Sequence, residues 1–505
     1  MFLLVGSIGW QIVAAGGDQP LGGQTDSTRD DPPEDWDKPP PWGCCNRVQV
    51  VTFRSDGNVA AQYELTRMKN APLRKFWHTT LRKGFASFPR SVRFSIFRSF
   101  IDCDPAPDPR LMLKIADTKE ELEACFRLLH DAYVASGFQK PDPSGMRATI
   151  YHALPTTTTL CATYDGEVVG TMSLIRDSSF GFPMQQVFEL GGVRAKGGNI
   201  AEVSALAVHP RYRSTGGAIL FPLMKFMYEY STAFFDTRHL VIAVNPNRIE
   251  MYESLLFFQR LNEKKIDNYD FVNGAPAIGA SLDLSTAPEI FKQIYGRRTQ
   301  RKNLHSYFTE ITLPNIVVPN RRYFTTNDPV MTPELLDYFF NQKTRVFENL
   351  DDRRRVMLRA IYDTSEYADV LPALDQTART GHRLRRHQRY AIKCPASIQL
   401  GDTSDTRARA MLVIEASEQG LLASSSVVVP LNQWFDVTVQ LGNAERSQLR
   451  VMAVRESVNG VSGWYAFRIE QPDPSWIKLV NALQAGQTHE DLQNASIFTP
   501  APVSA

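Results

Sequence analysis

The sequence has few cysteines, no long apolar run and almost no net charge, and each shortage excludes a class of protein. Six cysteines in 505 residues, none in a C-x-x-C pair, argue against a disulfide scaffold and a zinc site and favour a reducing, cytoplasmic location. No run reaches the ~18 apolar residues of a membrane-spanning helix. Because 56 Lys and Arg balance 54 Asp and Glu, no single electrostatic partner dominates. The 43% of hydrophobic residues indicates a globular chain, and the length predicts about three domains.

Residues 1–64 are expected to lie outside any folded domain. Residues 18–41 combine many acids and six prolines with almost no large apolar side chain, so burial cannot offset the entropy of folding. The apolar first 17 residues lack the basic start of a signal peptide. Two interpretations stay open: an exported or tethered leader, or translation that begins at Met68, which we favour.

Residues 65–110 form a basic, aromatic lead-in segment. Nine Lys and Arg alternate with seven large aromatic residues between 65 and 101, without one Asp or Glu. We favour an arm that packs on the following domain. The alternative is contact with a membrane surface, which would place the protein peripherally at the inner membrane. A nucleic-acid polymer is disfavoured because no recognition motif accompanies the basic residues.

Residues 111–285 predict a mixed α/β domain, since strand and helix periodicities alternate. Thr118 and Glu121 have the spacing of a capping box. Strands are predicted at 113–118, 160–164, 168–175, 200–208, 239–245 and 275–284. Helices are predicted at 119–136, 216–235 and 248–258. A polar, glycine-rich insertion occupies 178–198.

The rest of the chain predicts three further segments. Residues 286–378 are a helical extension or connector, with helices at 333–341 and 351–362. Residues 379–486 contain short alternating runs between turn residues, typical of an all-β module, and a closing helix at 474–485. The polar tail at 487–505 is expected to be loose.

A strand that ends at Val208 leads into the turn Arg213-x-x-Gly216-x-Ala218 and then a long helix. Backbone N–H groups at a helix start attract phosphate, glycines such as Gly217 expose them, and Arg213 adds a cation. This arrangement resembles the acyl-donor motif of the GNAT acyltransferase superfamily. Asn245 and Tyr252, followed by Leu255 and Phe257, resemble the family's N-x-x-A-x-x-x-Y-x-x-L-G-F, although Arg248 and Leu256 depart from it. The resemblance covers residues 112–284 and implies cofactor contacts at Asn245.

The segment FELGGVRAKGGNIAEVSALAV resembles bacterial long-chain N-acyl amino acid synthases, relatives of acyl-homoserine-lactone synthases whose strand reads E-x-S-R. Glu202 and Ser204 match, and Ala205 replaces the Arg. The resemblance implies a long-chain acyl phosphopantetheine donor, on acyl carrier protein or CoA, and an amino acid or small amine as acceptor. No metal is implied.

The chemistry of amide formation assigns roles to these residues. An amine that attacks a thioester must lose a proton, and the thiolate must gain one. Glu202 is the predicted base, with Ser204 beside it, and resemblance makes Tyr252 the acid. Leu206 and Val208 would share one strand face with Glu202 by the period of two, and their backbone would pair with the pantetheine arm.

A second motif lies at the start of the all-β module. Arg385 and Arg389 form R-x-x-x-R, Arg386 is an additional expected contact, and Glu415-x-Ser417-x-x-Gly420 follows. Together they resemble the PilZ domain, with Glu415 in place of Asp or Asn. The resemblance implies cyclic di-GMP as a regulatory ligand, because guanidinium groups suit phosphates and guanine.

The sequence therefore predicts a GNAT-like N-acyltransferase followed by a helical connector and a PilZ barrel. The alternative is a non-enzymatic cyclic di-GMP effector whose degenerate acyltransferase domain binds a protein partner. An ordinary acetyltransferase is disfavoured by the insertion at 178–198.

Overall fold

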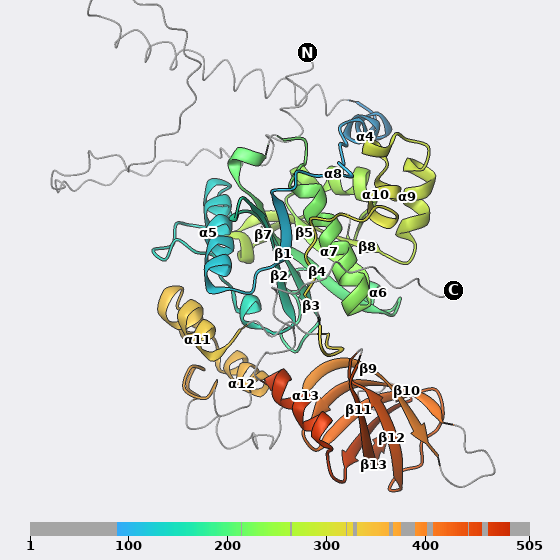
Figure 1. The fold of residues 1–505 in the computed structure, drawn as a ribbon. Helices are drawn as coiled ribbons and strands as arrows, with labels where there is room; N and C mark the ends of the chain where they lie inside the picture. Colours follow the sequence, from blue (N-terminus) through green and yellow to red (C-terminus); the bar gives the residue numbers. More distant parts are fainter. Residues whose placement is uncertain are drawn as a thin grey trace, which may run out of the picture. The chain divides into compact units, whose positions relative to one another are not determined.

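The computed structural model describes residues 88–484 with short gaps (Figure 1). The gaps are 214, 263–264, 320, 327–330, 363–366, 375–388, 401–407, 443 and 457–462. The predicted leader (1–64), the first half of the basic segment with Met68, and the tail therefore lie outside the described residues. In the part that is described, no helix is long and apolar enough to cross a membrane, and no group of His, Cys, Asp or Glu side chains is placed to hold a metal ion.

The first described domain is a mixed sheet flanked by helices, as predicted. Its strands follow the order β1-β2-β3-β4-β5-β8-β6, with β7 also paired to β8. All neighbours are antiparallel except β4 and β5. The strands are β1 (Leu111–Ile115), β2 (Thr157–Tyr164), β3 (Glu167–Arg176), β4 (Asn199–Val208), β5 (Thr237–Val244), β6 (Gln259–Arg260), β7 (Ile266–Tyr269) and β8 (Ala275–Asp283). The short strands β6 and β7 were not predicted.

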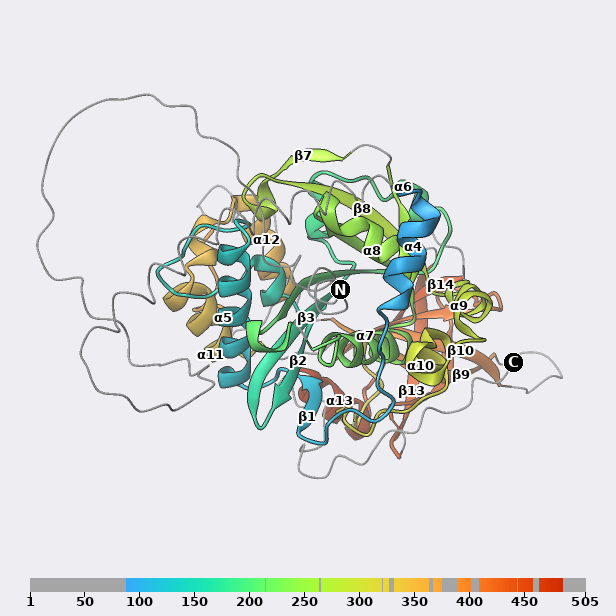
Figure 2. The same cartoon turned by 90° about the horizontal axis from the view of Figure 1, so that it is seen from above.

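Helices cover both faces of this sheet because β2, β3, β4, β5 and β8 place residues in two apolar clusters. On one face lies α5 (Lys119–Ala135), whose N-cap Thr118 accepts a hydrogen bond from the Glu121 backbone, as the capping box predicts. On the other face lies α7 (Leu220–Phe235), and Figure 2 shows the strands between these two helices. The other helices up to residue 309 are α4 (Arg90–Ser99), α6 (Gly191–Arg194), α8 (Pro246–Leu256), α9 (Ala287–Tyr295) and α10 (Leu304–Thr309).

The last part of α4 packs on α8. The guanidinium of Arg98 donates a hydrogen bond to the Ser254 carbonyl over 2.9 Å and lies over the Phe257 ring. This end of the basic segment thus makes the intramolecular contact that we favoured for it.

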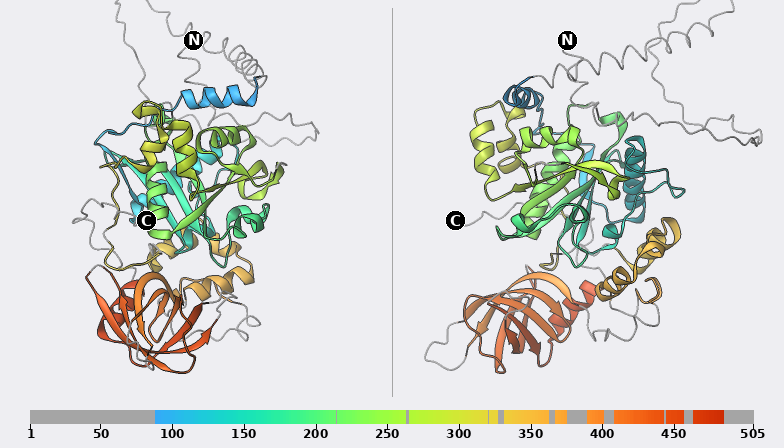
Figure 3. Two further views of the ribbon diagram at one scale, coloured as in Figure 1. Left: turned by 90° about the vertical axis from the view of Figure 1, so that its right-hand side faces the viewer. Right: turned by 180° about the vertical axis from the view of Figure 1, so that it is seen from behind.

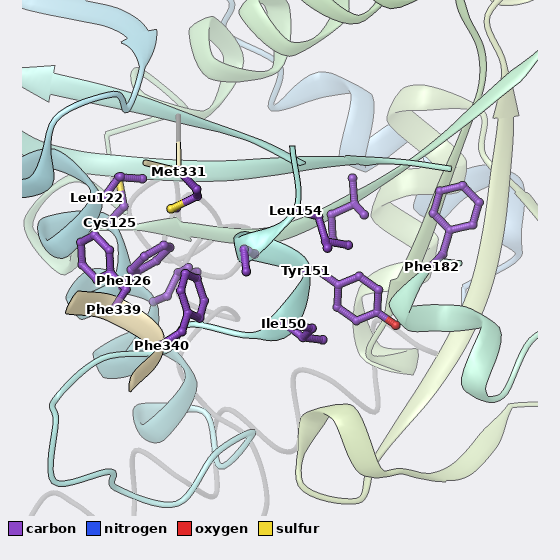
Figure 4. Close-up of a cluster of buried hydrophobic side chains, with 14 of the residues drawn as sticks. Leu122, Cys125, Phe126, Ile150, Tyr151, Leu154, Phe182, Met331, Phe339 and Phe340 are labelled. Carbon is purple, nitrogen blue, oxygen red and sulfur yellow. The ribbon is translucent and has the colours of Figure 1, made fainter. Parts of the chain in front are cut away.

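The helical residues after the sheet contribute to the core of the same domain. Helix α11 (Pro333–Leu336) continues as a π-helical turn (Asp337–Lys343), and α12 (Asp352–Ile361) follows. Phe339 is fully buried, and its ring meets that of Phe126 on α5 edge-on at 5.2 Å (Figure 4). This segment therefore shares the apolar cluster of α5 and extends the sheet domain.

We expect Phe339→Ala to destabilise the sheet domain by about 3 kcal/mol, since it removes a fully buried ring from a packed core. The described tryptophans, Trp434, Trp464 and Trp476, all belong to the C-terminal barrel. In urea unfolding, the midpoint followed by circular dichroism should therefore move to a lower urea concentration. The midpoint followed by tryptophan fluorescence should stay where it is. Equal shifts of both signals would contradict the assignment of this segment to the sheet domain.

The C-terminal module is a closed barrel with strand order β10-β11-β14-β13-β12-β9, shown in orange and red in Figure 3. Its elements are β9 (Tyr390–Gln399), β10 (Arg409–Ser417), β11 (Gly420–Ser425), β12 (Trp434–Gln440), β13 (Arg446–Glu456), β14 (Trp464–Ile469) and the helix α13 (Pro474–Gln484). Helix α13 inserts Trp476 into the core and donates its indole N–H to the Ser417 carbonyl over 2.9 Å. The predicted all-β module with a closing helix is confirmed. Strand β11 was missed because its small residues show little alternation.

Candidate active site

The two central strands of the sheet separate along their length. Parallel pairing of β4 with β5 ends at Glu202 and Val241, although β4 continues to Val208 and β5 to Val244. Ala205 has φ +52°, and the register with β3 shifts at this point, which identifies a β-bulge. Beyond Glu202, the β4 backbone that faces β5 therefore has no ladder partner among the described residues. An extended pantetheine arm could add to this free edge.

Glu202 lies at the point where the strands part. Its side chain is 2% exposed, and one carboxyl oxygen accepts a hydrogen bond from the Met184 backbone N–H over 3.0 Å. Burial raises the pKa of Glu202 to about 8, and the Met184 hydrogen bond only partly opposes this shift. A carboxyl group with a pKa near neutrality can accept a proton and release it again, which is the property of a general base.

The bulge at Ala205 contradicts one prediction about this strand. Val203, Leu206 and Val208 pack against the cluster on the α7 face, whereas Ala205 and Ala207 belong to the α5 face. Met184, which holds Glu202, also belongs to the α5 cluster. Glu202 therefore does not share a face with Leu206 and Val208, because the extra residue of the bulge reverses the alternation. Ser204 is half-buried and opposite Ser173 of β3.

The insertion at 178–198 encloses Glu202. It forms a 3-10 turn (Pro183–Gln186) and the short α6, and it buries five apolar side chains in the α5-side cluster. These are Phe182, Met184, Phe188, Leu190 and Val193. Its Met184 supplies the backbone N–H that Glu202 accepts, so the insertion both desolvates and orients the carboxyl group.

The helix that follows the glycine turn after β4 starts later in the sequence than predicted. Gly216 and Gly217 have φ +70° and +98°, so they cannot begin a helix, and α7 starts at Leu220 rather than near Gly216. Ala218 lies in the same turn. Arg213 folds back and donates from Nε to the Val208 carbonyl over 2.7 Å. The turn and the free edge of β4 are thereby held together.

Helix α8 follows β5 and carries the remaining predicted residues. It starts at Pro246 rather than Arg248, because the side chain of Asn245 caps it by accepting from the Asn247 N–H over 3.1 Å. Tyr252 is half-buried, with its ring edge-on to Phe258 at 5.9 Å. Burial raises the pKa of Tyr252, so its hydroxyl keeps a proton that a leaving thiolate could take.

Two tyrosines near Glu202 were missed by sequence reasoning. Burial raises the pKa values of Tyr151 and Tyr269, and the negative charge of Glu202 adds to both shifts. The hydroxyl of Tyr269 is buried and has no hydrogen-bond partner among the residues that the structure describes. Tyr151 extends toward the segment that carries Phe182 (Figure 4). No motif marks these residues, since each is a lone aromatic in a turn or a short edge strand.

A neighbouring histidine holds Tyr151 in place. His152 accepts the Thr149 backbone N–H on Nδ1 over 3.0 Å, so its Nε2–H faces the Ser173 hydroxyl at 3.3 Å. Burial lowers the pKa of His152 to about 3, and the ring therefore stays neutral. This histidine positions the turn and does not act as a base.

The barrel brings together the described part of the second motif. Arg389 forms an ion pair with Glu415 at 3.3 Å. The hydroxyl of Ser417 donates to the Gly420 carbonyl over 2.9 Å, and a Cβ at Gly420 would lie 3.0 Å from the Phe467 carbonyl oxygen. Gly420 thus has a structural reason for lacking a side chain. Arg385 and Arg386 lie outside the described residues.

Comparison with known proteins identifies the family that the sheet domain is similar to. Residues 124–283, about a third of the chain, match the family model of the N-acyl amino acid synthase FeeM. This match supports an N-acyltransferase. It spans the sheet from α5 to the end of β8 and includes Glu202 and Tyr252. None of the curated proteins matches the chain.

Solved structures include similar proteins. FeeM from uncultured soil microbes is 27% identical over 36% of this chain and 94% of that chain, with a TM-score of 0.31. The CoA-dependent acyl-homoserine lactone synthase BjaI is 20% identical over 41% of this chain and 93% of its own, with a TM-score of 0.30. A GNAT acetyltransferase from Streptococcus pneumoniae is 14% identical over 34% and 98%, with a TM-score of 0.25.

Proposed function

We propose that the sheet domain transfers a long-chain acyl group from a phosphopantetheine thioester, on acyl carrier protein or CoA, to an amino acid or small amine. The observation that carries this proposal is Glu202, a buried carboxyl group with a pKa of about 8 at the point where β4 and β5 part. The match of residues 124–283 to N-acyl amino acid synthases supports it.

The residues can be given roles in this reaction. The donor arm would lie along the free edge of β4 between Val203 and Val208, with its phosphates at the turn of Gly216 and Gly217. Glu202 would accept the proton of the attacking amine, and backbone N–H groups of the free edge would stabilise the oxyanion. Tyr252 would protonate the departing thiolate. The amide bond forms as the carbon–sulfur bond breaks, so the proton lost by the amine balances the one gained by the thiol.

The test is an incubation of full-length protein with long-chain acyl carrier protein or acyl-CoA and a pool of amino acids. Lipid extracts analysed by mass spectrometry should contain an N-acyl amino acid. No acyl amide with either donor would contradict the proposal, and transfer from one donor alone would identify the carrier.

The barrel is proposed to bind cyclic di-GMP and thereby regulate the transfer. The ion pair of Arg389 with Glu415 is relevant, because an anionic ligand must compete with Glu415 for the guanidinium. We expect Arg389→Ala to weaken cyclic di-GMP binding about 10- to 100-fold, as the loss of a charge-assisted contact predicts. Glu415→Gln should tighten binding instead. Calorimetric titration measures both, and equal affinities in all three proteins would contradict the assigned site.

A further inference from the structure

Tyr362, the residue directly after α12, is hydrogen-bonded to the 3-10 turn Ile150–Ala153. Its backbone N–H donates to the Leu358 carbonyl over 3.0 Å, so the end of α12 fixes where the side chain starts. Its hydroxyl donates to the Ala153 carbonyl, and both residues are buried. The helical segment of α11 and α12 is therefore bonded directly to the turn beside the candidate site.

A row of aromatic rings connects the same two segments in a second way. Phe339, in the π-helical turn after α11, meets Phe126 of α5 edge-on at 5.2 Å (Figure 4). Phe126 in turn meets the His152 ring edge-on at 5.1 Å. All three rings are buried, so they pack closely and move little relative to one another. The helical segment thus supports the turn through both the Tyr362 hydroxyl and Phe126.

The turn contacts the strands that carry the candidate site. The Nε2 atom of His152 lies 3.3 Å from the Ser173 hydroxyl of β3. Ser173 pairs with Ser204 of β4, next to the register shift that accompanies the bulge at Ala205. The free edge of β4 begins at this bulge. A contact that fixes Ser173 therefore helps to fix the backbone that is proposed to bind the donor.

We propose that Tyr362 is a positioning residue for the acyl transfer. Through the Ala153 carbonyl it holds the turn, and the turn holds the bulge of β4 through His152 and Ser173. The proposal rests on the function proposed above and adds to the site a segment beyond residues 124–283, which match the FeeM family model. Backbone N–H groups stabilise an oxyanion only at the correct distance, and a misplacement of about 1 Å can cost about 100-fold in rate.

The experiment removes one hydroxyl from each of two tyrosines in the same helical segment. Tyr362→Phe keeps the ring, which stacks on Tyr367 at 4.6 Å, and loses the hydrogen bond to the turn. Full-length Tyr362→Phe should lower kcat for amide formation about 10-fold with little change in the acceptor KM. Tyr338→Phe is the matched control, because its hydroxyl donates to Glu123 of α5 over 2.7 Å and not to the turn. It should keep the wild-type kcat.

Both rates are measured well below the melting temperatures of the variants, so that unfolding does not contribute. A double-mutant cycle with Ser173→Ala, which removes the hydroxyl that faces His152, tests the route through the turn. If Tyr362 acts along this route, the double variant should be about as slow as the slower single variant. Effects that multiply, or a wild-type kcat in Tyr362→Phe, would overturn the proposal.

Hydrogen exchange tests the positioning of the turn independently of catalysis. The backbone amides of His152 and Leu154 are hydrogen-bonded within the turn. They should exchange faster in Tyr362→Phe than in the wild type, and at the wild-type rate in Tyr338→Phe. If the wild type forms no acyl amide, the acyl-transfer function fails separately and exchange alone decides whether Tyr362 holds the turn. Equal protection of the turn in Tyr362→Phe and the wild type would contradict that role.

Discussion

Glu202→Gln is expected to lower kcat by about 10²- to 10⁴-fold, the usual contribution of a general base. Glutamine keeps the shape of the side chain and can still accept the Met184 N–H, but it cannot take a proton from the amine. The expected defect is therefore chemical rather than structural. Amide formation measured at saturating acceptor and donor tests this expectation.

The pH profile separates this role from simple packing. Glu202 accepts a proton only when ionised, and its raised pKa of about 8 means that this form increases up to that pH. Wild-type kcat/KM should rise with pH and level off above about 8. The rise that belongs to Glu202 should be absent from Glu202→Gln. Glu167→Gln, the same change at an exposed glutamate of β3, should behave as the wild type. A wild-type rate in Glu202→Gln at every pH would exclude the base.

The same substitution is expected to change stability in a pH-dependent way. Unfolding returns the carboxyl group to its ordinary pKa of 4.5, whereas the folded protein holds the proton up to about pH 8. Between these values the folded state binds more protons, so wild-type stability falls as pH rises. A gap of this size corresponds to about 5 kcal/mol once the pH lies above 8.

Because glutamine does not ionise, Glu202→Gln should become progressively more stable relative to the wild type between pH 4.5 and 8. The difference should be constant below and above that window. Urea unfolding followed by circular dichroism at several pH values measures it. Parallel pH curves for wild type and Glu202→Gln would show that folding does not shift the pKa of Glu202.

The sequence was sufficient for the elements that depend on local patterns. The capping box at Thr118, the strands β2 and β3 and the strand–turn–helix unit around Arg213 depend on neighbours in the chain, and the structure contains them. The GNAT-like order followed by an all-β barrel could be predicted for the same reason. The starts of α7 and α8 moved, because the positive φ of Gly216 and Gly217 delays one helix and the Asn245 cap advances the other.

The tertiary structure determined on which face of the sheet each residue of β4 lies and which distant residues pack together. The bulge at Ala205 reversed the alternation of β4, which no period of two can predict, because the extra residue is absorbed only against β3. Phe339 joined the α5 cluster across more than two hundred residues, a packing that helical periodicity does not specify.

The candidate site shows the same division. Residue type and spacing selected Glu202, but only its enclosure by Met184 and the insertion gives the carboxyl group a pKa near neutrality. Tyr151 and Tyr269 carry no motif, and only the fold brings them near the charge of Glu202. Local chemistry determined which elements form and which residue could be a base. Burial depends on segments that are distant in the sequence, so only the folded protein determined the surroundings of Glu202 and hence the pKa of its carboxyl group.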